Sequence, residues 1–174
     1  MIPVQFNYEA PESLEDAVKL LNNNDTAMIL AGSHSLMTEL KQGRASPSLL
    51  ADLLKIPGLQ GLKHQANGVL QIGGMTTYDQ VAAAPEVRAN CQALAEAADS
   101  IGDAQIRNWQ TIGDLVAYRD LARDLPAIAL ALEATFHTVG VSGNHTMSAE
   151  KLLQMAVQAQ WKAQESVSSI DFPA

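Results

Sequence analysis

The first twenty residues combine a strand pattern with a helix pattern. Apolar and polar residues alternate over 4–8, which is the period of a short strand with two unlike faces. Ser13 then stands where it can cap a helix, and Leu14, Val18 and Leu21 recur on one helical face. This pattern predicts a strand followed by an amphipathic helix.

Two apolar runs follow, separated by a second helix signal. Residues 27–32 predict a buried strand that ends in a turn. A short helix is expected at 35–41, with Gly43 ending it. Residues 49–54 form the second apolar run, and Pro57 comes soon after it. Pro57 is therefore the expected joint between two lobes, at 1–56 and 57–174.

The rest of the chain contains a hairpin signal and several longer elements. The Asn67-Gly68 pair predicts the turn between two strands at 59–64 and 69–74. Helices are expected at 77–84, 91–101, 126–134 and 148–163, and strands at 134–140 and 166–172, with a short polar strand after a turn at 142–144. Because strands and helices mix without strict alternation, the predicted fold class is α+β.

Charge and composition narrow the classes of partner. The 174 residues hold 11 Lys plus Arg against 19 Asp plus Glu, a net charge of -8, which argues against nucleic acid or an anionic membrane surface. No apolar run is long enough to span a bilayer, and the first residues lack a signal-peptide pattern. Cys91 is the only cysteine, which excludes internal disulfides and Cys-ligated iron–sulfur clusters within the chain. The four histidines lack metal-ligand spacing, so no metal site is predicted, and we expect a cytoplasmic protein.

One candidate ligand segment lies in the first lobe. An apolar strand runs into Ala31, Gly32, Ser33, His34 and Ser35, and a helix begins at once. Such a turn directs free backbone N–H groups and the positive helix end at one spot, which favours an anion such as a phosphate. Local pattern alone favours the alternative that this is an ordinary strand–helix connector.

A second candidate segment spans 105–127. It is either a loop with an ordinary helix start, where Asp124 caps and Pro126 follows, or a second wall of the same ligand site. The residues themselves leave both interpretations open.

Taken together, these segments resemble the FAD-binding subunit, or medium chain, of the molybdenum hydroxylases, such as carbon monoxide dehydrogenase and xanthine dehydrogenase. The resemblance rests on six blocks that keep the order and spacing of that family: 6–21, 30–36, 49–62, 70–81, 101–127 and 165–173. It implies a two-lobed FAD-binding domain of the vanillyl-alcohol-oxidase (PCMH) type, without the C-terminal domain with which the family usually continues. It also implies a flavoprotein oxidoreductase that transfers electrons, with molybdenum-binding and iron–sulfur subunits as partners and no catalytic side chain of its own.

The resemblance also assigns residues to the cofactor. Ala31, Gly32, Ser33, His34 and Ser35 would line the pyrophosphate of FAD from one lobe; Thr111, Ile112, Gly113, Asp114 and Leu115 would face it from the other; Asp120 and Asp124 match family acids near the ribose and adenine.

Several of these positions depart from the family pattern. Ser33 and Asp114 each replace a glycine, Gln110 stands where the family has glycine, and Leu115 replaces an asparagine. A carboxylate about 4 Å from a phosphate is repelled by roughly 1 kcal/mol in water and about 4 kcal/mol at an effective dielectric constant near 20. A cofactor-free relative that acts as an interaction or scaffold domain, or binds another small ligand in the cleft, is therefore the alternative hypothesis.

Overall fold

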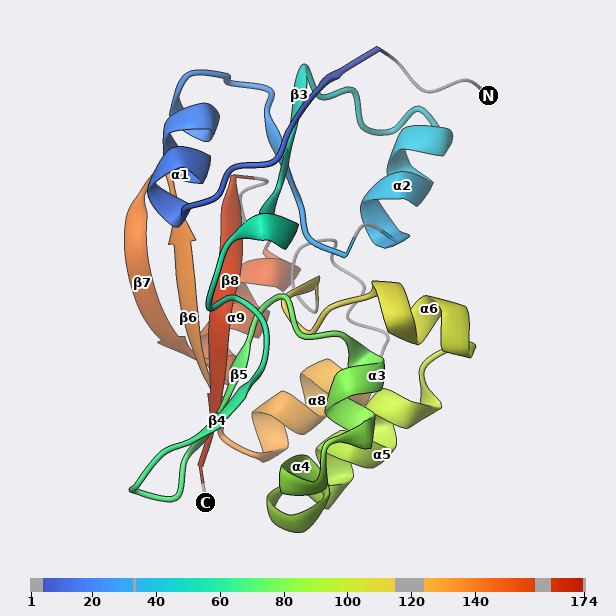
Figure 1. Ribbon diagram of the computed structural model, residues 1–174, viewed down its shortest axis with the longest axis vertical. Coiled ribbons are helices and arrows are strands. Elements are labelled where there is room, and N and C mark those ends of the chain that lie inside the picture. Colours follow the sequence, from blue (N-terminus) through green and yellow to red (C-terminus); the bar gives the residue numbers. More distant parts are fainter. Residues whose placement is uncertain (1–4, 33, 115–123, 159–163, 174) are drawn as a thin grey trace.

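The protein contains two sheets and the helices that pack on them. The first sheet is formed by β1 to β3, between residues 7 and 52, and the second by β4 to β8, between residues 62 and 172. The computed structural model describes residues 5–32, 34–114, 124–158 and 164–173. A three-stranded sheet lies at the top of Figure 1 and a five-stranded sheet below it. The architecture is α+β, as predicted from the sequence.

The first sheet is parallel, with strand order β1-β3-β2. Its strands are β1 (Asn7–Glu9), β2 (Met28–Leu30) and β3 (Leu49–Asp52), connected by α1 (Leu14–Asn22) and α2 (His34–Lys41). Parallel strands need such crossover helices, because a tight turn cannot return the chain in the same direction. The first strand was predicted at 4–8 and is found at Asn7–Glu9, and all three of its residues are exposed.

Helix α1 begins where the sequence predicts. The Ser13 side chain accepts a hydrogen bond from the Asp16 N–H at 3.1 Å, which satisfies one of the free donors at the helix start. The buried face, however, is centred on Ala17 and Leu21, while Val18 is half-buried. The prediction is thus confirmed for Leu21, whereas Ala17 and not Val18 is the other buried residue of the helix.

The apolar run at 49–54 does not continue as one strand. It divides into β3 and the short 3₁₀ helix η1 (Leu53–Lys55). The Asp52 side chain accepts a hydrogen bond from the Leu54 N–H at 2.9 Å and so caps this turn. The cap ends the strand before Pro57.

The second sheet is antiparallel, with strand order β4-β5-β8-β6-β7. Its strands are β4 (Leu62–His64), β5 (Leu70–Gly73), β6 (Thr135–Gly140), β7 (Gly143–Ser148) and β8 (Glu165–Phe172). The predicted hairpin is confirmed as β4 and β5. The last strand lies in the middle of the sheet, where β8 pairs with both β5 and β6.

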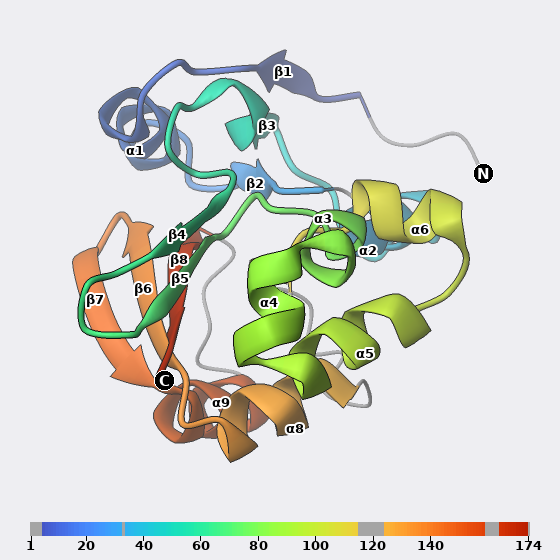
Figure 2. The ribbon, with the colours of Figure 1, turned by 60° about the horizontal axis from the view of Figure 1, so that its bottom comes forward.

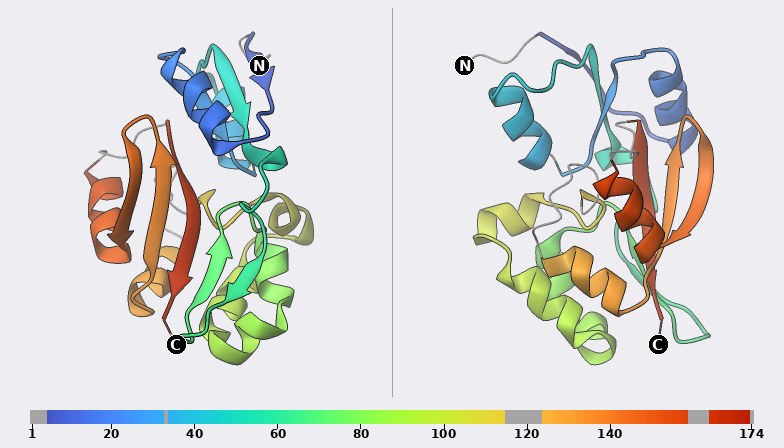
Figure 3. Two further views of the ribbon diagram at one scale, coloured as in Figure 1. Left: turned by 60° about the vertical axis from the view of Figure 1, so that its left-hand side comes forward. Right: turned by 180° about the vertical axis from the view of Figure 1, so that it is seen from behind.

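Helices cover one face of the second sheet. They are α3 (Tyr78–Ala83), α4 (Pro85–Asn90), α5 (Gln92–Ser100), α8 (Asp124–Ala131) and α9 (Ala149–Val157). Helix α6 (Ala104–Trp109) contacts α3 and has no buried residue. Figure 2 shows α3 to α5 beside the sheet, and the right panel of Figure 3 shows α8 and α9 in front of it. Phe136, Ile170 and Phe172 of the strands share one core with Tyr78 and Leu94 of the helices.

Two of the helices were not predicted from the sequence. The predicted helices at 77–84, 91–101 and 126–134 correspond to α3, α5 and α8, but α4 and α6 were not expected. Both are short and have at most one buried residue, so neither has an apolar face that a helical period could reveal; α3, equally short, buries three residues. The predicted last helix corresponds to α9, and its end at 159–163 lies outside the described residues.

A second buried core lies between the two sheets. Ala17, Leu21 and Ile29, from the part of the chain that forms the first sheet, pack in one buried cluster with Leu59 and Met75, which flank β4 and β5 of the second. This shared core holds the two sheets together. Within the described residues, no helix is both long and apolar enough to cross a membrane.

The cap of α1 provides a direct test of the N-terminal architecture. We expect Ser13→Ala to lower the free energy of unfolding by about 1 kcal/mol, because the Asp16 N–H loses its acceptor. Urea unfolding measures the change, and Ser13→Asp, which keeps an acceptor, is the control. Equal losses in both variants would contradict the capping role.

Candidate functional site

At Gly32 the turn after β2 lies directly against the backbone of Trp109 and Thr111. Gly32 has φ +72°, a backbone conformation that favours glycine. A Cβ atom added there would lie 2.5 Å from the Trp109 carbonyl oxygen and 2.9 Å from the Thr111 backbone nitrogen. The structure therefore brings together the two segments that the sequence singled out, and only glycine permits the approach.

Backbone hydrogen bonds hold the second segment against its own lobe. The N–H groups of Ile112 and Gly113 donate to the carbonyls of Thr76 and Gly74, both at 2.8 Å, and the Asp114 N–H donates to the Thr111 carbonyl. A Cβ atom on Gly113 would lie 2.7 Å from the Gly74 oxygen. These three N–H groups are thus used within the protein and shape the loop.

Asp114 is buried beside Gln110, two of the positions that depart from the family pattern. Asp114 is only 8 % exposed and Gln110 is fully buried. The Gln110 amide Nε2 donates to Asp114 Oδ2 at 3.5 Å. The amide of one of these residues therefore contacts the carboxylate of the other.

The remaining residues that were predicted to bind the cofactor lie at different places in the structure. Ala31 is half-buried and packs on the core that joins the lobes. His34 and Ser35 form the start of α2, whereas Ser33, Leu115 and Asp120 lie outside the described residues. Asp124 is exposed at the first residue of α8.

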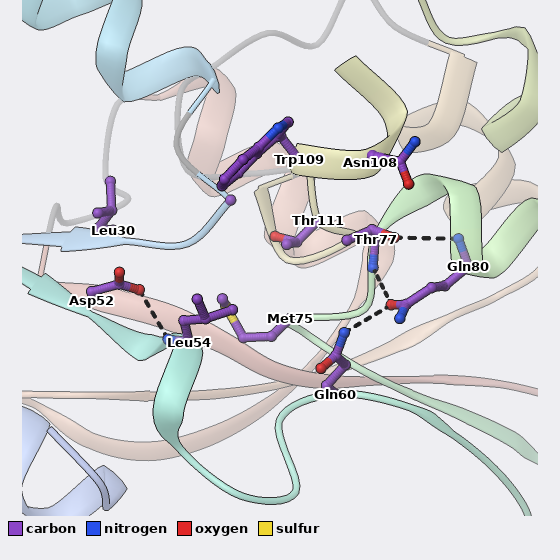
Figure 4. Close-up of a pocket in the computed structure, with 11 residues that line it drawn as sticks. Leu30, Asp52, Leu54, Gln60, Met75, Thr77, Gln80, Asn108, Trp109 and Thr111 are labelled. Atoms are coloured by element: carbon purple, nitrogen blue, oxygen red, sulfur yellow. Dashed lines mark hydrogen bonds between the residues drawn. The ribbon is translucent and has the colours of Figure 1, made fainter. Parts of the chain in front are cut away.

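A cavity of about 500 Å³ lies next to the Gly32–Thr111 contact. Figure 4 shows its walls, which come from both lobes. The described lining residues are Leu30, Gly32, Asp52, Leu54, Gln60, Met75, Thr77, Gln80, Asn108, Trp109 and Thr111. Two of them, Gly32 and Thr111, were predicted from the sequence, but Ile112, Gly113, Asp114 and Asp124 do not line it.

Most of the residues that line the cavity were not predicted from the sequence. Leu54, Gln60 and Gln80 come from η1, the segment before β4, and α3, and only the fold places them together. Trp109 carried one usable signal, since it stands two residues before Thr111 in a candidate segment. Its ring is 66 % exposed, which is unusual for so large an apolar group.

Asp52 supplies the cavity with a carboxylate. Its Oδ2 accepts a hydrogen bond from the Tyr8 hydroxyl at 2.6 Å. This hydrogen bond, assisted by partial desolvation and by the negative charge of Asp52, raises the pKa of Tyr8. Asp52 Oδ1 caps η1 through Leu54, so the carboxylate is fixed from both sides.

The junction has the features of a phosphate site. Thr111 is 2 % exposed, and its Oγ1 has no hydrogen-bond partner in the part of the chain that the structure describes. The hydroxyl can donate to an anion, and the positive end of α2 begins two residues after Gly32. The residues at this junction therefore fit a phosphate-bearing cofactor.

Comparison with known proteins gives the family. The family described as the FAD binding domain in molybdopterin dehydrogenase matches residues 4–174. The chain is 40 % identical over 151 residues to the carbon monoxide dehydrogenase medium chain of Hydrogenophaga pseudoflava, covering 86 % of this chain and 52 % of that protein. It is 33 % identical over 173 residues to the glyceraldehyde dehydrogenase medium chain of Sulfolobus acidocaldarius, covering 99 % and 61 %.

Solved structures agree with this assignment. A carbon monoxide dehydrogenase from Hydrogenophaga pseudoflava matches with a TM-score of 0.91 at 37 % identity, covering all of this chain and 61 % of that one. The chain therefore belongs to the family of FAD-binding domains in molybdopterin dehydrogenases, as the sequence resemblance implied. It spans about half to three-fifths of the length of these relatives.

The close approach at Gly32 can be tested against a matched glycine. Gly58 has φ +80°, but a Cβ atom there would meet nothing within 4 Å. We expect Gly32→Ala to lower the free energy of unfolding by about 2 kcal/mol more than Gly58→Ala, because only Gly32 adds a steric clash to the conformational penalty. Urea unfolding of both variants measures the difference, and equal effects would contradict the contact.

The Gln110–Asp114 contact can be tested with a double-mutant cycle. We expect Gln110→Ala and Asp114→Ala to be non-additive, with a coupling free energy of about 0.5–1.5 kcal/mol in unfolding experiments. The cycle removes the contribution of any other partner of Asp114. Additive effects would show that the two substitutions are independent of each other.

Proposed function

We propose that this chain binds FAD in the cleft between its two lobes and serves as the flavin-carrying component of an oxidoreductase of the molybdenum-hydroxylase type. FAD, when bound, would supply the redox chemistry, and the chain would supply position and electric field. Electron transfer, rather than activation of a substrate by a side chain, would be its role.

The observation that carries this proposal is the buried hydroxyl of Thr111, which has no hydrogen-bond partner among the described residues. A buried hydroxyl without a partner is unfavourable, and a phosphate oxygen would satisfy it. The turn at Gly32 and the start of α2 would complete the phosphate site from the first lobe. Family membership supports FAD as the source of that phosphate.

The individual cofactor residues stay predictions. We propose that Thr111 and the start of α2 contact the pyrophosphate, and that Ile112, Gly113 and Asp114 act by holding the loop in shape. The roles of Ala31, Ser33, His34, Ser35, Asp120 and Asp124 are proposed from the family resemblance alone.

The partners are also proposed. Relatives are named as medium chains or as subunits of dehydrogenase complexes, and one similar structure is a Cu,Mo-CO dehydrogenase. These names support a partner subunit that carries molybdenum, whereas an iron–sulfur partner is proposed from the family resemblance alone. The two-sheet architecture supports lobes at 1–56 and 57–174, while the PCMH-type arrangement and a cytoplasmic location stay predictions from the sequence.

The alternative of a cofactor-free relative gains no support from the comparisons, because the matched family is defined by FAD binding. Spectroscopy separates the two hypotheses. We expect the purified protein to bind FAD with the visible absorption of a flavoprotein. A protein that stays colourless and shows no heat of binding with FAD would overturn the proposed function.

The Thr111 hydroxyl provides a sharper test. We expect Thr111→Val to weaken FAD binding by about tenfold or more, since a hydrogen bond to a charged phosphate is lost. The variant should not destabilise the FAD-free protein, because its hydroxyl has no partner among the described residues. Calorimetric titration with FAD measures the affinity, and chemical unfolding measures the stability.

Thr138 is a matched control. It is also 2 % exposed, and its Oγ1 likewise lacks a partner within the described ranges, but it lies on β6 and does not line the cavity. Thr138→Val should leave FAD affinity unchanged. If the two variants behave alike, the Thr111 hydroxyl does not contact the cofactor.

A further inference from the structure

Gln164 connects the second sheet to the end of the first helix. This residue immediately precedes β8, the central strand of the second sheet, and it is half-buried. Its Nε2 group donates to three backbone carbonyl oxygens, those of Leu21 at 3.4 Å, Asn24 at 3.3 Å and Asp25 at 3.4 Å. One amide therefore joins two segments that lie far apart along the chain.

The three carbonyls lie at the end of α1 and in the turn that follows it. The last carbonyls of a helix have no partner within the helix, and they carry the negative end of its dipole. An amide N–H group suits this position because it donates a hydrogen bond and brings no negative charge. A side chain of the same length without a donor would leave the three carbonyls without this contact.

The backbone around Gln164 is held firmly in the second sheet. Glu165 pairs with Gly140 of β6, and a Cβ atom on Gly140 would lie 2.6 Å from the Gln164 carbonyl oxygen. Val141, which follows β6, packs against the core between the two sheets. Helix α1 contacts β6 and lies at its upper end in Figure 1. The Gln164 amide thus reaches from a fixed strand end to α1.

Strand β2 is consequently held at both of its ends. Gln164 contacts the Asp25 carbonyl before the strand, and the backbone of Trp109 and Thr111 lies against Gly32 after it. The core between these two points is apolar, and apolar contacts have no preferred direction, whereas hydrogen bonds do. The contact at Gln164 therefore resists rotation of the first sheet about the contact at Gly32.

We propose that Gln164 is a positioning residue for the cofactor, because its amide and the contact at Gly32 together set the angle between the two sheets. Gln164 is not among the described residues that line the cavity, so it would act through α1 and β2. The inference rests on the proposed function, in which FAD contacts both parts of the chain. A cofactor that bridges them binds more tightly when the angle is set beforehand, since less binding free energy is used to fix it.

Two substitutions at Gln164 test the role of the amide donor. Gln164→Met keeps the length of the side chain without a donor, and Gln164→Glu places a carboxylate against the same carbonyls. We expect Gln164→Met to weaken FAD binding by about fivefold in calorimetric titration, because the net contribution of a hydrogen bond is lost. Gln164→Glu should weaken it further. Circular dichroism checks that each variant is folded.

Gln158 provides the matched controls. It is exposed in the turn after α9 and is not among the described residues that line the cavity. Gln158→Met and Gln158→Glu make the same chemical changes away from the end of α1. Both should bind FAD as the wild type does.

Pulsed electron paramagnetic resonance measures the arrangement of the sheets without FAD. Lys41→Cys on α2 and Ala93→Cys on α5 place spin labels at two exposed positions, whereas the native Cys91 is buried. We expect the distribution of distances between the labels to be broader or shifted in Gln164→Met. It should be unchanged in Gln158→Met.

The inference requires both readouts to change in Gln164→Met. FAD affinity at the wild-type value would overturn it, and so would weaker binding with unchanged label distances, since the amide would then act by another route. A wild-type protein that binds no FAD refutes the proposed function itself. In that case the label distances still decide whether Gln164 sets the angle between the sheets.

Discussion

The close approach of Gly32 to the backbone of Trp109 and Thr111 is the constraint on which the site depends. A side chain at Gly32 would overlap the Trp109 carbonyl, so the two segments can touch only because the first lobe presents bare backbone. The contact sets the distance between the start of α2 and the Thr111 hydroxyl. It also closes one side of the cavity, so the proposed phosphate site and the cavity share a wall.

The loop behind this contact is held by the protein itself. Ile112 and Gly113 donate their N–H groups to the turn between β5 and α3, and Gly113 has no room for a side chain. A site formed this way needs little reordering when a ligand binds, which lowers the entropic penalty of binding.

Asp114 looks damaging in the sequence because a carboxylate near a phosphate is repelled. In the fold Asp114 is buried against the Gln110 amide and is not among the residues that line the cavity. Two positions that the sequence analysis singled out therefore contact each other.

The sequence by itself determined the local elements and the family. The Ser13 cap, the Asn67-Gly68 hairpin and the apolar periods of β6 and β8 are local signals, and the order of the six blocks carried the family assignment. Only the tertiary structure decided that β8 inserts between β5 and β6, and that Leu54, Gln60 and Gln80 line one cavity with Trp109. These contacts join residues far apart along the chain, and neither a period of two nor one of 3.6 residues specifies which distant segments will meet.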